Sequence, residues 1–300
     1  MLYTELEKNR VIFSSLFRND FQELYAQIGM IARSCSTTSS TVSHTKDYWV
    51  RDFMPLQIDE HLFVQYIYNP DYLINHQSYI TDVDDVISKC SCTNGRNMIK
   101  LPLVIDGGNM VFCKGHQHNT TDNYLVMTEK AIIENPRYSR EQIEQQLREA
   151  FHEPQLHIVW LPWDTKDTFG HTDGIVRYVG VTKTGKPRVL VNLELYDDDI
   201  ANQMYDALIQ HFEVIELQLS TYDELSWAYI NSLQTQHYTI VPGIGNAVTD
   251  AEALEQYRHL FPQHSGNIYQ IQMRDFIAQY GGALNCLTWT LYHHSRCKRQ

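Results

Sequence analysis

Two hydrophobic periods alternate along the chain. Short runs rich in β-branched and aromatic residues, such as Arg10 to Leu16 and Leu62 to Ile67, have the pattern of strands. Between them, Asp20 to Arg33 carries apolar residues at the spacing of an amphipathic helix. Because the alternation continues along the whole sequence, it predicts an α/β fold and not an all-α one.

A long helix is predicted from Asp198 to Phe212. Its apolar side chains recur every four residues on one face, at Ile200, Met204, Leu208 and Phe212. A second helix is predicted to begin at Ser139, because Gln142 three residues later completes the pattern of a capping box. Both helices are therefore expected to pack against strands.

Strand-like runs surround these helices and continue after them. They are Leu156 to Trp160, Gly174 to Val179, Arg188 to Leu193, Glu213 to Leu219, Tyr238 to Val241 and Asn267 to Ile271. The order strand, strand, helix, strand recurs several times. Since no Gly/Ser-rich linker, low-complexity tract or close repeat interrupts it, the sequence predicts one domain over residues 1–300.

The composition is that of an ordinary soluble globular protein, with 300 residues of which 43% are apolar and 20% charged. A net charge of -12 argues against nucleic acid as a partner and mildly favours a cationic ligand. The first ten residues lack a secretory pattern and no apolar run could span a bilayer, so no membrane association is expected. The oligomeric state stays open, a homo-oligomer included.

The six cysteines indicate reduced thiols and a cytoplasmic location, because no secretory signal accompanies them. A zinc site is the competing interpretation for one group of them, which comprises Cys90, Cys92, Cys113, His116 and His118. Its Cys-x-Cys spacing is atypical of zinc sites, and the two histidines fit a polar loop. Structural zinc is therefore not the favoured interpretation.

Four short motifs carry the candidate chemistry. They are WVRD at 49–52, DGGN at 106–109, GHTD at 170–173 and GGALNC at 281–286, each with glycine or proline in it or near it, where chains turn and expose side chains. Cys286 is the candidate nucleophile, because the resonance-stabilised carbon of a guanidinium group needs a soft thiolate. The motifs together indicate a site that cleaves a guanidine.

The remaining motif residues supply what such an attack requires. Asp52 and Asp173 would hold a planar cation whose N–H groups match carboxylate oxygens. His171 is the candidate acid and base, since imidazole titrates near neutrality. Asp106 would orient that ring and raise its pKa. Trp49 either forms a wall of the binding pocket or belongs to the core.

In this order the motifs resemble those of the agmatine deiminase and bacterial peptidylarginine deiminase family, from about Thr45 to Thr288. The resemblance implies a five-module pseudo-symmetric α/β propeller, the fold of the guanidino-modifying enzymes, with neither a metal nor an organic cofactor. It also implies the roles given above for the site residues. A covalent thiouronium on Cys286 would be hydrolysed to a ureido product after ammonia has left.

The substrate implied by the resemblance is a small-molecule or peptidyl guanidino compound, and agmatine would place the enzyme in putrescine biosynthesis. Three positions depart from the family pattern and keep the substrate open: Met54 replaces a glycine, Asp106 replaces a common glutamate, and Asn285 replaces a histidine. No arginine can be assigned to a substrate carboxylate. Asn109 is expected to shape its turn.

Three alternatives stay open. Capture of the covalent adduct by an amine would make the protein an amidinotransferase. A papain-like thiol hydrolase would use Cys286 and His171 without the aspartate pair. A binding module would keep the fold without catalysis. If the deiminase interpretation holds, nearby acids should raise the thiol pKa until a guanidinium binds.

Overall fold

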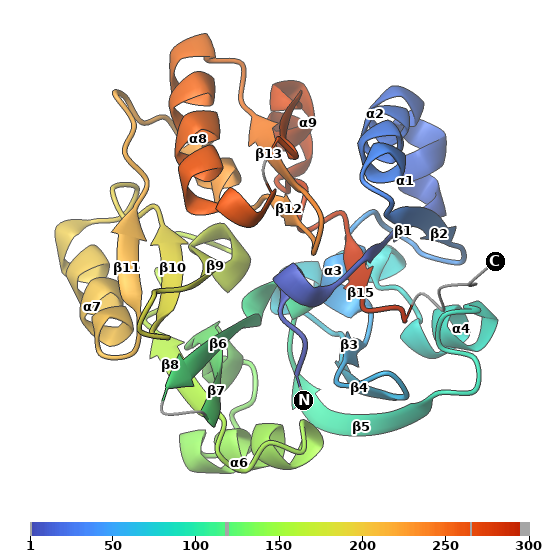
Figure 1. The fold of residues 1–300 in the computed structure, drawn as a ribbon. Helices are drawn as coiled ribbons and strands as arrows, with labels where there is room; N and C mark the ends of the chain where they lie inside the picture. The colour runs from blue at the N-terminus through green and yellow to red at the C-terminus, as the bar shows by residue number, and fades with distance from the viewer. Residues whose placement is uncertain (1, 118–119, 265, 295–300) are drawn as a thin grey trace.

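Five three-stranded sheets are arranged in a ring, with short segments of chain at its centre (Figure 1). The computed structural model describes residues 2–117, 120–264 and 266–294. In every sheet the middle strand pairs antiparallel with one neighbour and parallel with the other. This shared pattern makes the sheets five versions of one module and confirms the predicted propeller.

The chain builds four of the sheets from consecutive strands and the fifth from both ends. The strands are β3 (Leu56–Gln57), β4 (Leu62–Ile67) and β5 (Asn97–Val104); β6 (Val111–Gln117), β7 (Thr120–Thr128) and β8 (His157–Leu161); β9 (Val176–Val181), β10 (Pro187–Val191) and β11 (Glu213–Glu216); β12 (Leu233–Gln234), β13 (Thr239–Gly243) and β14 (Ile268–Gln272); and β1 (Arg10–Ser14), β2 (Thr38–Val42) and β15 (Trp289–Leu291). Because β15 pairs with β1, the two ends of the chain close the ring.

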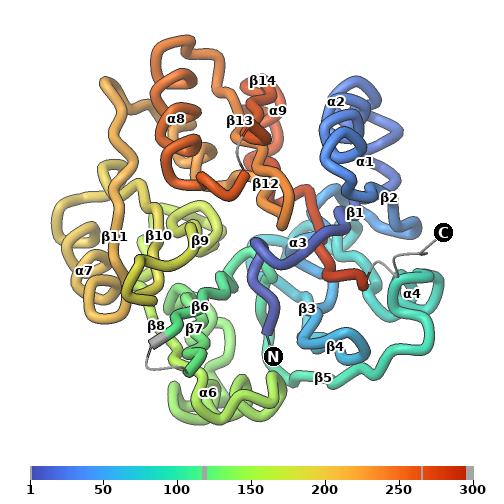
Figure 2. The backbone as a smooth tube through the Cα atoms, in the orientation of Figure 1, coloured from blue at the N-terminus to red at the C-terminus, as the bar shows by residue number. Residues whose placement is uncertain are grey.

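A helical crossover joins the parallel strands of each module, as parallel pairing requires. These helices are α1 (Ser15–Asp20) and α2 (Gln22–Ser34), α4 (Val83–Lys89), α5 (Lys130–Ile133) and α6 (Arg140–Ala150), α7 (Asp198–Ile209), and α8 (Ala247–Leu260). They lie on the outside of the ring (Figure 2). Two further helices, α3 (Val50–Phe53) and α9 (Arg274–Tyr280), connect one module to the next. The predicted order strand, strand, helix, strand is therefore the module itself.

The predicted elements are present with boundaries shifted by local capping. β4 has the predicted bounds, and Ser139 caps α6 in the predicted capping box. The first strand ends at Ser14 instead of Leu16, because the Ser14 side chain accepts a hydrogen bond from the backbone N–H of Leu16 and starts α1. The helix predicted from Asp20 to Arg33 is α2 alone, since Phe21 separates it from α1.

Three other predicted elements are shorter than expected. The strand predicted from Glu213 to Leu219 ends at Glu216. Gly174 belongs to a 3₁₀ turn, η5 (Thr172–Gly174), so that strand begins at Val176. The helix that begins at Asp198 ends at Ile209, although Phe212 beyond it is still fully buried. Phe212 therefore packs on the core from the turn that leads into β11.

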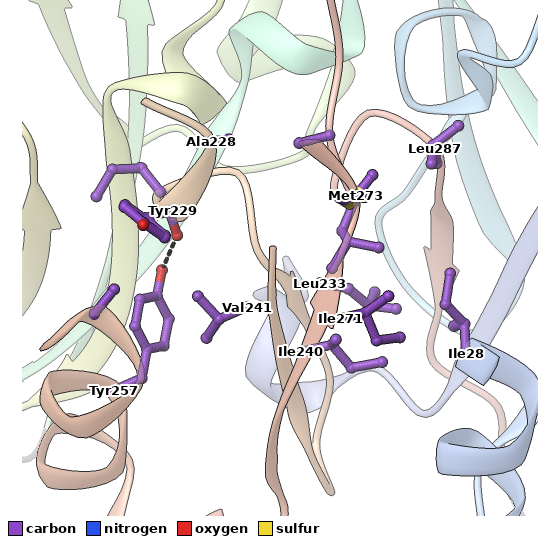
Figure 3. Close-up of a cluster of buried hydrophobic side chains, with 14 of the residues drawn as sticks. Ile28, Ala228, Tyr229, Leu233, Ile240, Val241, Tyr257, Ile271, Met273 and Leu287 are labelled. Carbon is purple, nitrogen blue, oxygen red and sulfur yellow. Dashed lines mark hydrogen bonds between the residues drawn. The ribbon is translucent and has the colours of Figure 1, made fainter. Parts of the chain in front are cut away.

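The largest core cluster joins three neighbouring modules, those of β1, β2 and β15, of β9 to β11, and of β12 to β14. Figure 3 shows part of it, where Tyr257 of α8 lies against Tyr229 and Val241. The Tyr257 hydroxyl donates a 2.7 Å hydrogen bond to the backbone oxygen of Tyr229. Full burial of one such large side chain stabilises a fold by roughly 1.5–3 kcal/mol. These contacts pack α8 against β13 and against the segment that contains Tyr229.

The N-terminal segment, residues 2–8, lies in the middle of the ring in both views (Figures 1 and 2). Leu2 is buried in one core cluster, and Leu6 packs against two others. Glu5 pairs with Arg51 at 3.2 Å, and Glu7 pairs with Lys114 of β6 at 2.6 Å. The segment therefore ties several modules together across the axis.

The competing zinc interpretation gains no support. Cys90 and Cys92 follow α4, whereas Cys113 belongs to β6 in the next module. Residues 2–117, 120–264 and 266–294 hold no group of three or more side chains placed to bind a metal ion, and His118 lies outside them. Within the same residues, no helix combines the length and apolar character needed to cross a bilayer.

Candidate active site

The candidate residues from all four motifs meet around one pocket of about 760 Å³. Five of the six predicted site residues line it, namely Trp49, Asp52, His171, Asp173 and Cys286. The sixth, Asp106, is buried behind the imidazole and contacts it. Segments separated by more than 200 residues in the sequence therefore converge, as the motifs predicted.

The short helix α3 places Asp52 at the pocket. The backbone N–H of Trp49, which precedes the helix, donates a 2.9 Å hydrogen bond to Asp47 Oδ1. Asp52 is 4% exposed and its Oδ1 accepts a 3.0 Å hydrogen bond from the backbone N–H of Gly108. This hydrogen bond thus fixes the WVRD and DGGN motifs relative to each other.

The glycines of the DGGN turn are required by close approach. A Cβ on Gly107 would lie 2.0 Å from the backbone oxygen of Arg51. A Cβ on Gly108 would lie 2.7 Å from both Asp52 Oδ1 and His171 Nδ1. Any larger residue at either position would therefore push the acidic motif away from the imidazole.

Asn109 shapes its turn, as the sequence predicted. Its Oδ1 accepts hydrogen bonds from the backbone N–H of Thr128 at 2.8 Å and from the Thr172 hydroxyl at 2.7 Å. Thr172 lies between His171 and Asp173 in the chain. The asparagine therefore links the DGGN turn to the turn that carries the candidate acid and base.

The His171 imidazole lies between two carboxylates. Its Nε2 is 3.0 Å from Asp106 Oδ2, and its Nδ1 is 3.7 Å from Asp52 Oδ1. Burial alone would lower the pKa of His171, but the charge of Asp52 and the hydrogen bond to Asp106 outweigh it and raise the pKa to about 10. Aspartate at position 106 is thus long enough to hold the ring, despite being shorter than glutamate.

Asp173 has one oxygen fixed and one without a partner. Its Oδ2 accepts a 2.6 Å hydrogen bond from the Asn285 amide, and Arg177 Nη1 donates to the oxygen of that amide at 3.3 Å. Its Oδ1 is buried and accepts no hydrogen bond from the described residues. A buried acceptor of this kind fits a donor on a bound molecule. Asn285, where the family pattern has histidine, therefore positions a carboxylate.

Cys286 follows α9 in a loop shaped by two glycines. Gly281 ends the helix in the left-handed region with φ of 73°. A Cβ on Gly282 would lie 2.3 Å from Cζ3 of Trp49. Trp49 consequently serves both functions left open by the sequence, because it lines the pocket and also packs against the largest core cluster.

The thiol of Cys286 lies in an acidic environment. Asn231 Nδ2 donates to Sγ at 3.2 Å, and Asp173 Oδ2 is 3.8 Å from Sγ. Burial, followed by the charges of Asp173 and Asp52, raises the thiol pKa well above its usual value. The thiol is therefore protonated at neutral pH in this structure, as predicted.

The sequence did not reveal two residues, Asn231 and Tyr72, whose side chains contact the predicted site residues. Asn231 binds the thiol and also accepts hydrogen bonds from the backbone N–H groups of Asn285 and Cys286, at 3.0 and 3.2 Å. Tyr72 donates a 2.9 Å hydrogen bond to Asp106 Oδ2. Neither residue belongs to a motif. The sequence offers one signal for Asn231, which is a polar residue after an apolar run, and none for Tyr72.

Acidic side chains outnumber basic ones in the pocket lining. Six acidic residues contribute to it, namely Asp47, Asp52, Asp164, Asp167, Asp173 and Glu224. Among the described lining residues, Lys166 is the one lysine and there is no arginine; the Lys166 ammonium pairs with Asp197. The pocket is therefore built for a cation.

The five-module propeller is the fold that the sequence predicted for a guanidino-modifying enzyme, and a cysteine, a histidine and two aspartates line one pocket in it. The chain matches the model of the Porphyromonas-type peptidyl-arginine deiminase family over residues 16–291 and belongs to this family. Membership confirms the predicted enzyme class, a hydrolase of guanidino C–N bonds. A comparison with curated protein sequences finds no match.

Solved structures share the fold over nearly their whole length. The C. jejuni agmatine deiminase has a TM-score of 0.71 at 16% identity, with 97% of this chain and 96% of that chain covered. The agmatine deiminase of Enterococcus faecalis has a TM-score of 0.67 at 20% identity, with 96% and 94% covered. SxtG, an amidinotransferase from Microseira wollei, has a TM-score of 0.58 at 11% identity, with 97% and 96% covered. At these identities the likeness establishes the fold.

Proposed function

We propose that this protein is a guanidine deiminase that works through a covalent adduct on Cys286. The observation that carries the proposal is the meeting of a thiol, an imidazole and two buried carboxylates in one pocket. Asp52 and Asp173 would bind the N–H groups of the guanidinium and place its carbon next to Sγ. The unpartnered Oδ1 of Asp173 supports this role.

In the first step the thiolate attacks the guanidinium carbon. The positive charge of the bound guanidinium offsets the repulsion from Asp52 and Asp173, so the thiol releases its proton to the solvent when the substrate arrives, while His171 keeps its own proton. The C–N bond to the departing nitrogen then breaks, and His171 delivers the proton with which ammonia leaves. Nδ1 is the atom that exchanges this proton, because Nε2 is held by Asp106.

In the second step water replaces the thiol. His171, which has just lost a proton, accepts one from the water, and the resulting hydroxide attacks the thiouronium carbon. The C–S bond breaks, the departing thiolate takes the proton of the new hydroxyl group, and a ureido product leaves the pocket. Asp106 keeps the ring oriented in both steps, and the Asn231 amide donates to the sulfur as its charge changes.

The pocket charge favours a substrate without a carboxylate. Arginine would bring a carboxylate into a lining that holds six acidic residues, and the described lining offers only a lysine that is already paired. Agmatine carries an ammonium instead, and an arginyl peptide carries amides. We therefore propose agmatine or a similar cationic guanidine as the preferred substrate, ahead of free arginine.

A substrate panel tests the proposal. Ammonia and ureido product are measured with agmatine, free arginine and an arginyl peptide. Asp52→Asn and Asp173→Asn should each lower kcat/KM for the preferred substrate by about 100-fold or more, as loss of a buried charge partner does. Asp206→Asn, at an exposed position on α7, is the matched control and should keep full activity.

Each alternative predicts a different result from the same panel. Full activity of both aspartate variants would indicate a papain-like thiol hydrolase, for which the carboxylate pair is superfluous. Transfer of the amidino group to an added amine, in place of ureido product, would indicate an amidinotransferase. Absence of turnover with all three guanidines would contradict the proposal and favour a binding module.

A further inference from the structure

The segment between β4 and α4 lies along the pocket. This segment, residues 70–79, is called the strap here, and it contains two 3₁₀ turns, η2 (Asp71–Leu73) and η3 (Gln77–Tyr79). Tyr72, Leu73 and Tyr79 of the strap line the pocket. Most of the strap is exposed, whereas Tyr72 and Leu73 are half-buried. The strap therefore inserts one turn towards the site.

Tyr72 contacts the candidate catalytic pair directly. Its hydroxyl donates to Asp106 Oδ2 at 2.9 Å, the same oxygen that lies 3.0 Å from His171 Nε2. Its ring makes edge contacts with Phe169 and His171, at centroid distances of 5.0 and 6.3 Å. Both the carboxylate and the imidazole are thus restrained by one side chain.

An ion pair fixes the strap to the neighbouring module. Lys130 of α5 is almost fully buried, and its ammonium lies 2.7 Å from Asp71 Oδ1 and 3.3 Å from Glu134 Oε1. The same ammonium lies 5.9 Å from the centre of the Tyr72 ring and 4.9 Å from that of Trp163. A buried lysine with these partners restrains both Asp71 and the ring of Tyr72.

We propose that Tyr72 is a positioning residue for the His171–Asp106 pair and that the Asp71–Lys130 ion pair keeps it in place. The inference rests on the proposed function, since it concerns how the acid and base of that reaction is oriented. Two donors on one carboxylate oxygen restrict where Asp106 can move, and they divide its negative charge between Tyr72 and the imidazolium. The orientation of the imidazole then depends on the strap as well as on the turn η5, which His171 precedes.

Tyr72 remains a donor across the working pH range. Burial, followed by the charge of Asp106, raises the pKa of its hydroxyl well above the usual value. The groups that face the imidazole are Asp52 from α3, Asp106 from the DGGN turn, Asp173 from η5 and Tyr72 from the strap. Without the Tyr72 hydroxyl, the His171 imidazolium is the remaining hydrogen-bond donor to Asp106 Oδ2.

Tyr72→Phe tests the positioning role with two readouts. The Nε2 proton of His171, observed by NMR and assigned with His171→Gln, should move downfield because its hydrogen bond to Asp106 strengthens. With the preferred guanidine, kcat should fall about tenfold while KM stays within about twofold, since geometry changes and substrate contacts do not. Tyr79→Phe, which removes another strap hydroxyl, should leave the His171 resonance unchanged.

An unchanged His171 resonance in Tyr72→Phe would overturn the proposal, whatever happens to activity. A rise in KM without that change would instead make Tyr72 a substrate contact. The NMR readout needs no turnover, so it still tests Tyr72 if Cys286→Ala shows that the proposed function is wrong.

The ion pair is tested by Asp71→Asn, which leaves Lys130 its partner Glu134. The variant should lower kcat by a few fold, and the loss should disappear in the Tyr72→Phe background, because both changes act through one side chain. Asp84→Asn removes an exposed ion pair with Lys100 and is the matched control. An equal loss in both backgrounds would contradict a role of the ion pair in placing Tyr72.

Discussion

The chemistry of the site depends on a few residues whose charges act on one another. Cys286 is protonated because burial and two carboxylates oppose its thiolate, and His171 is charged because two carboxylates stabilise its imidazolium. The substrate would lower the pKa of the Cys286 thiol again, since the charge of a guanidinium placed between Asp52 and Asp173 offsets the charges of the two carboxylates. Substrate binding would then itself activate the nucleophile.

Alkylation of Cys286 should therefore depend on pH and on ligand. Without ligand the rate should rise only at pH values well above 9, and a guanidine that binds without turnover should shift the rise to lower pH. Peptide-level mass spectrometry separates Cys286 from the other cysteines. Asp173→Asn should lower the midpoint even without ligand. Identical profiles with and without the guanidine would contradict activation by the substrate.

Asn285 should act through Asp173. Asn285→Ala removes the 2.6 Å hydrogen bond to Asp173 Oδ2 and leaves that oxygen buried without its donor, which costs about 1–3 kcal/mol. We expect kcat/KM to fall about tenfold or more and the free energy of unfolding to fall in steady-state kinetics and urea denaturation. Asn285→His, the residue of the family pattern, should retain more activity than Asn285→Ala; equal losses would contradict a positioning role.

At the residue scale the four motifs could be predicted because each carries unusual chemistry beside glycine. Asn231 and Tyr72 could not, because their importance comes from partners 55 and 34 residues away. No local pattern distinguishes an asparagine that binds a thiol from one that closes a turn. Their roles become visible only when the modules are placed around the axis.

At the scale of elements, the candidate catalytic groups are carried by short segments between modules, not by the sheets. Asp52 lies in α3, while Asp106 and His171 each precede a 3₁₀ turn. Cys286 follows the αL residue that ends α9. Strand and helix types were predictable from periodicity. The start of α6 was also predictable, because its capping box can be read from the sequence, but most other ends were not, because caps such as Ser14 depend on side-chain hydrogen bonds.

The two glycines before Cys286 should respond differently to alanine. Gly281→Ala meets only ordinary contacts but forces φ of 73° on a side chain, which costs about 1 kcal/mol of stability and should leave kcat near wild type. Gly282→Ala would place Cβ 2.3 Å from Trp49 and displace that ring, so kcat/KM should fall about tenfold or more. Thermal unfolding and kinetics measure both. Equal kinetic losses in the two variants would contradict the close contact with Trp49.

At the scale of the whole molecule, five modules surround one site and both ends of the chain complete the ring. The recurrence of modules and the family resemblance made the propeller predictable. The closure was not, because Glu5 and Thr290, which are hydrogen-bonded, are 285 residues apart. The single domain over residues 1–300, like the cytoplasmic location, the exclusion of nucleic acid and the oligomeric state, stays a prediction.

Glu5 should couple the N-terminal segment to stability. Burial would raise its pKa, but the charges of Arg51 and Lys8 lower it to about 2. The stabilisation is therefore present above the unfolded pKa of 4.5 and is lost as the pH falls towards 2. Glu5→Gln should lower the free energy of unfolding by about 1–3 kcal/mol at pH 7 and by much less near pH 3.

Urea denaturation at the two pH values measures this difference. Glu213→Gln, which breaks an exposed pair with Arg188, should change stability by no more than about 0.5 kcal/mol at either pH. A Glu5→Gln effect that does not depend on pH would contradict the ion pairs across the axis.

The central claim is that Cys286 forms a covalent adduct with the guanidino carbon. Reaction with agmatine is quenched with acid within one turnover, and the intact mass and peptide masses are measured. The account predicts a Cys286 peptide heavier by the substrate minus ammonia, absent in Cys286→Ala. Turnover of agmatine by the wild-type protein without this adduct, or full activity of Cys286→Ala, would contradict it.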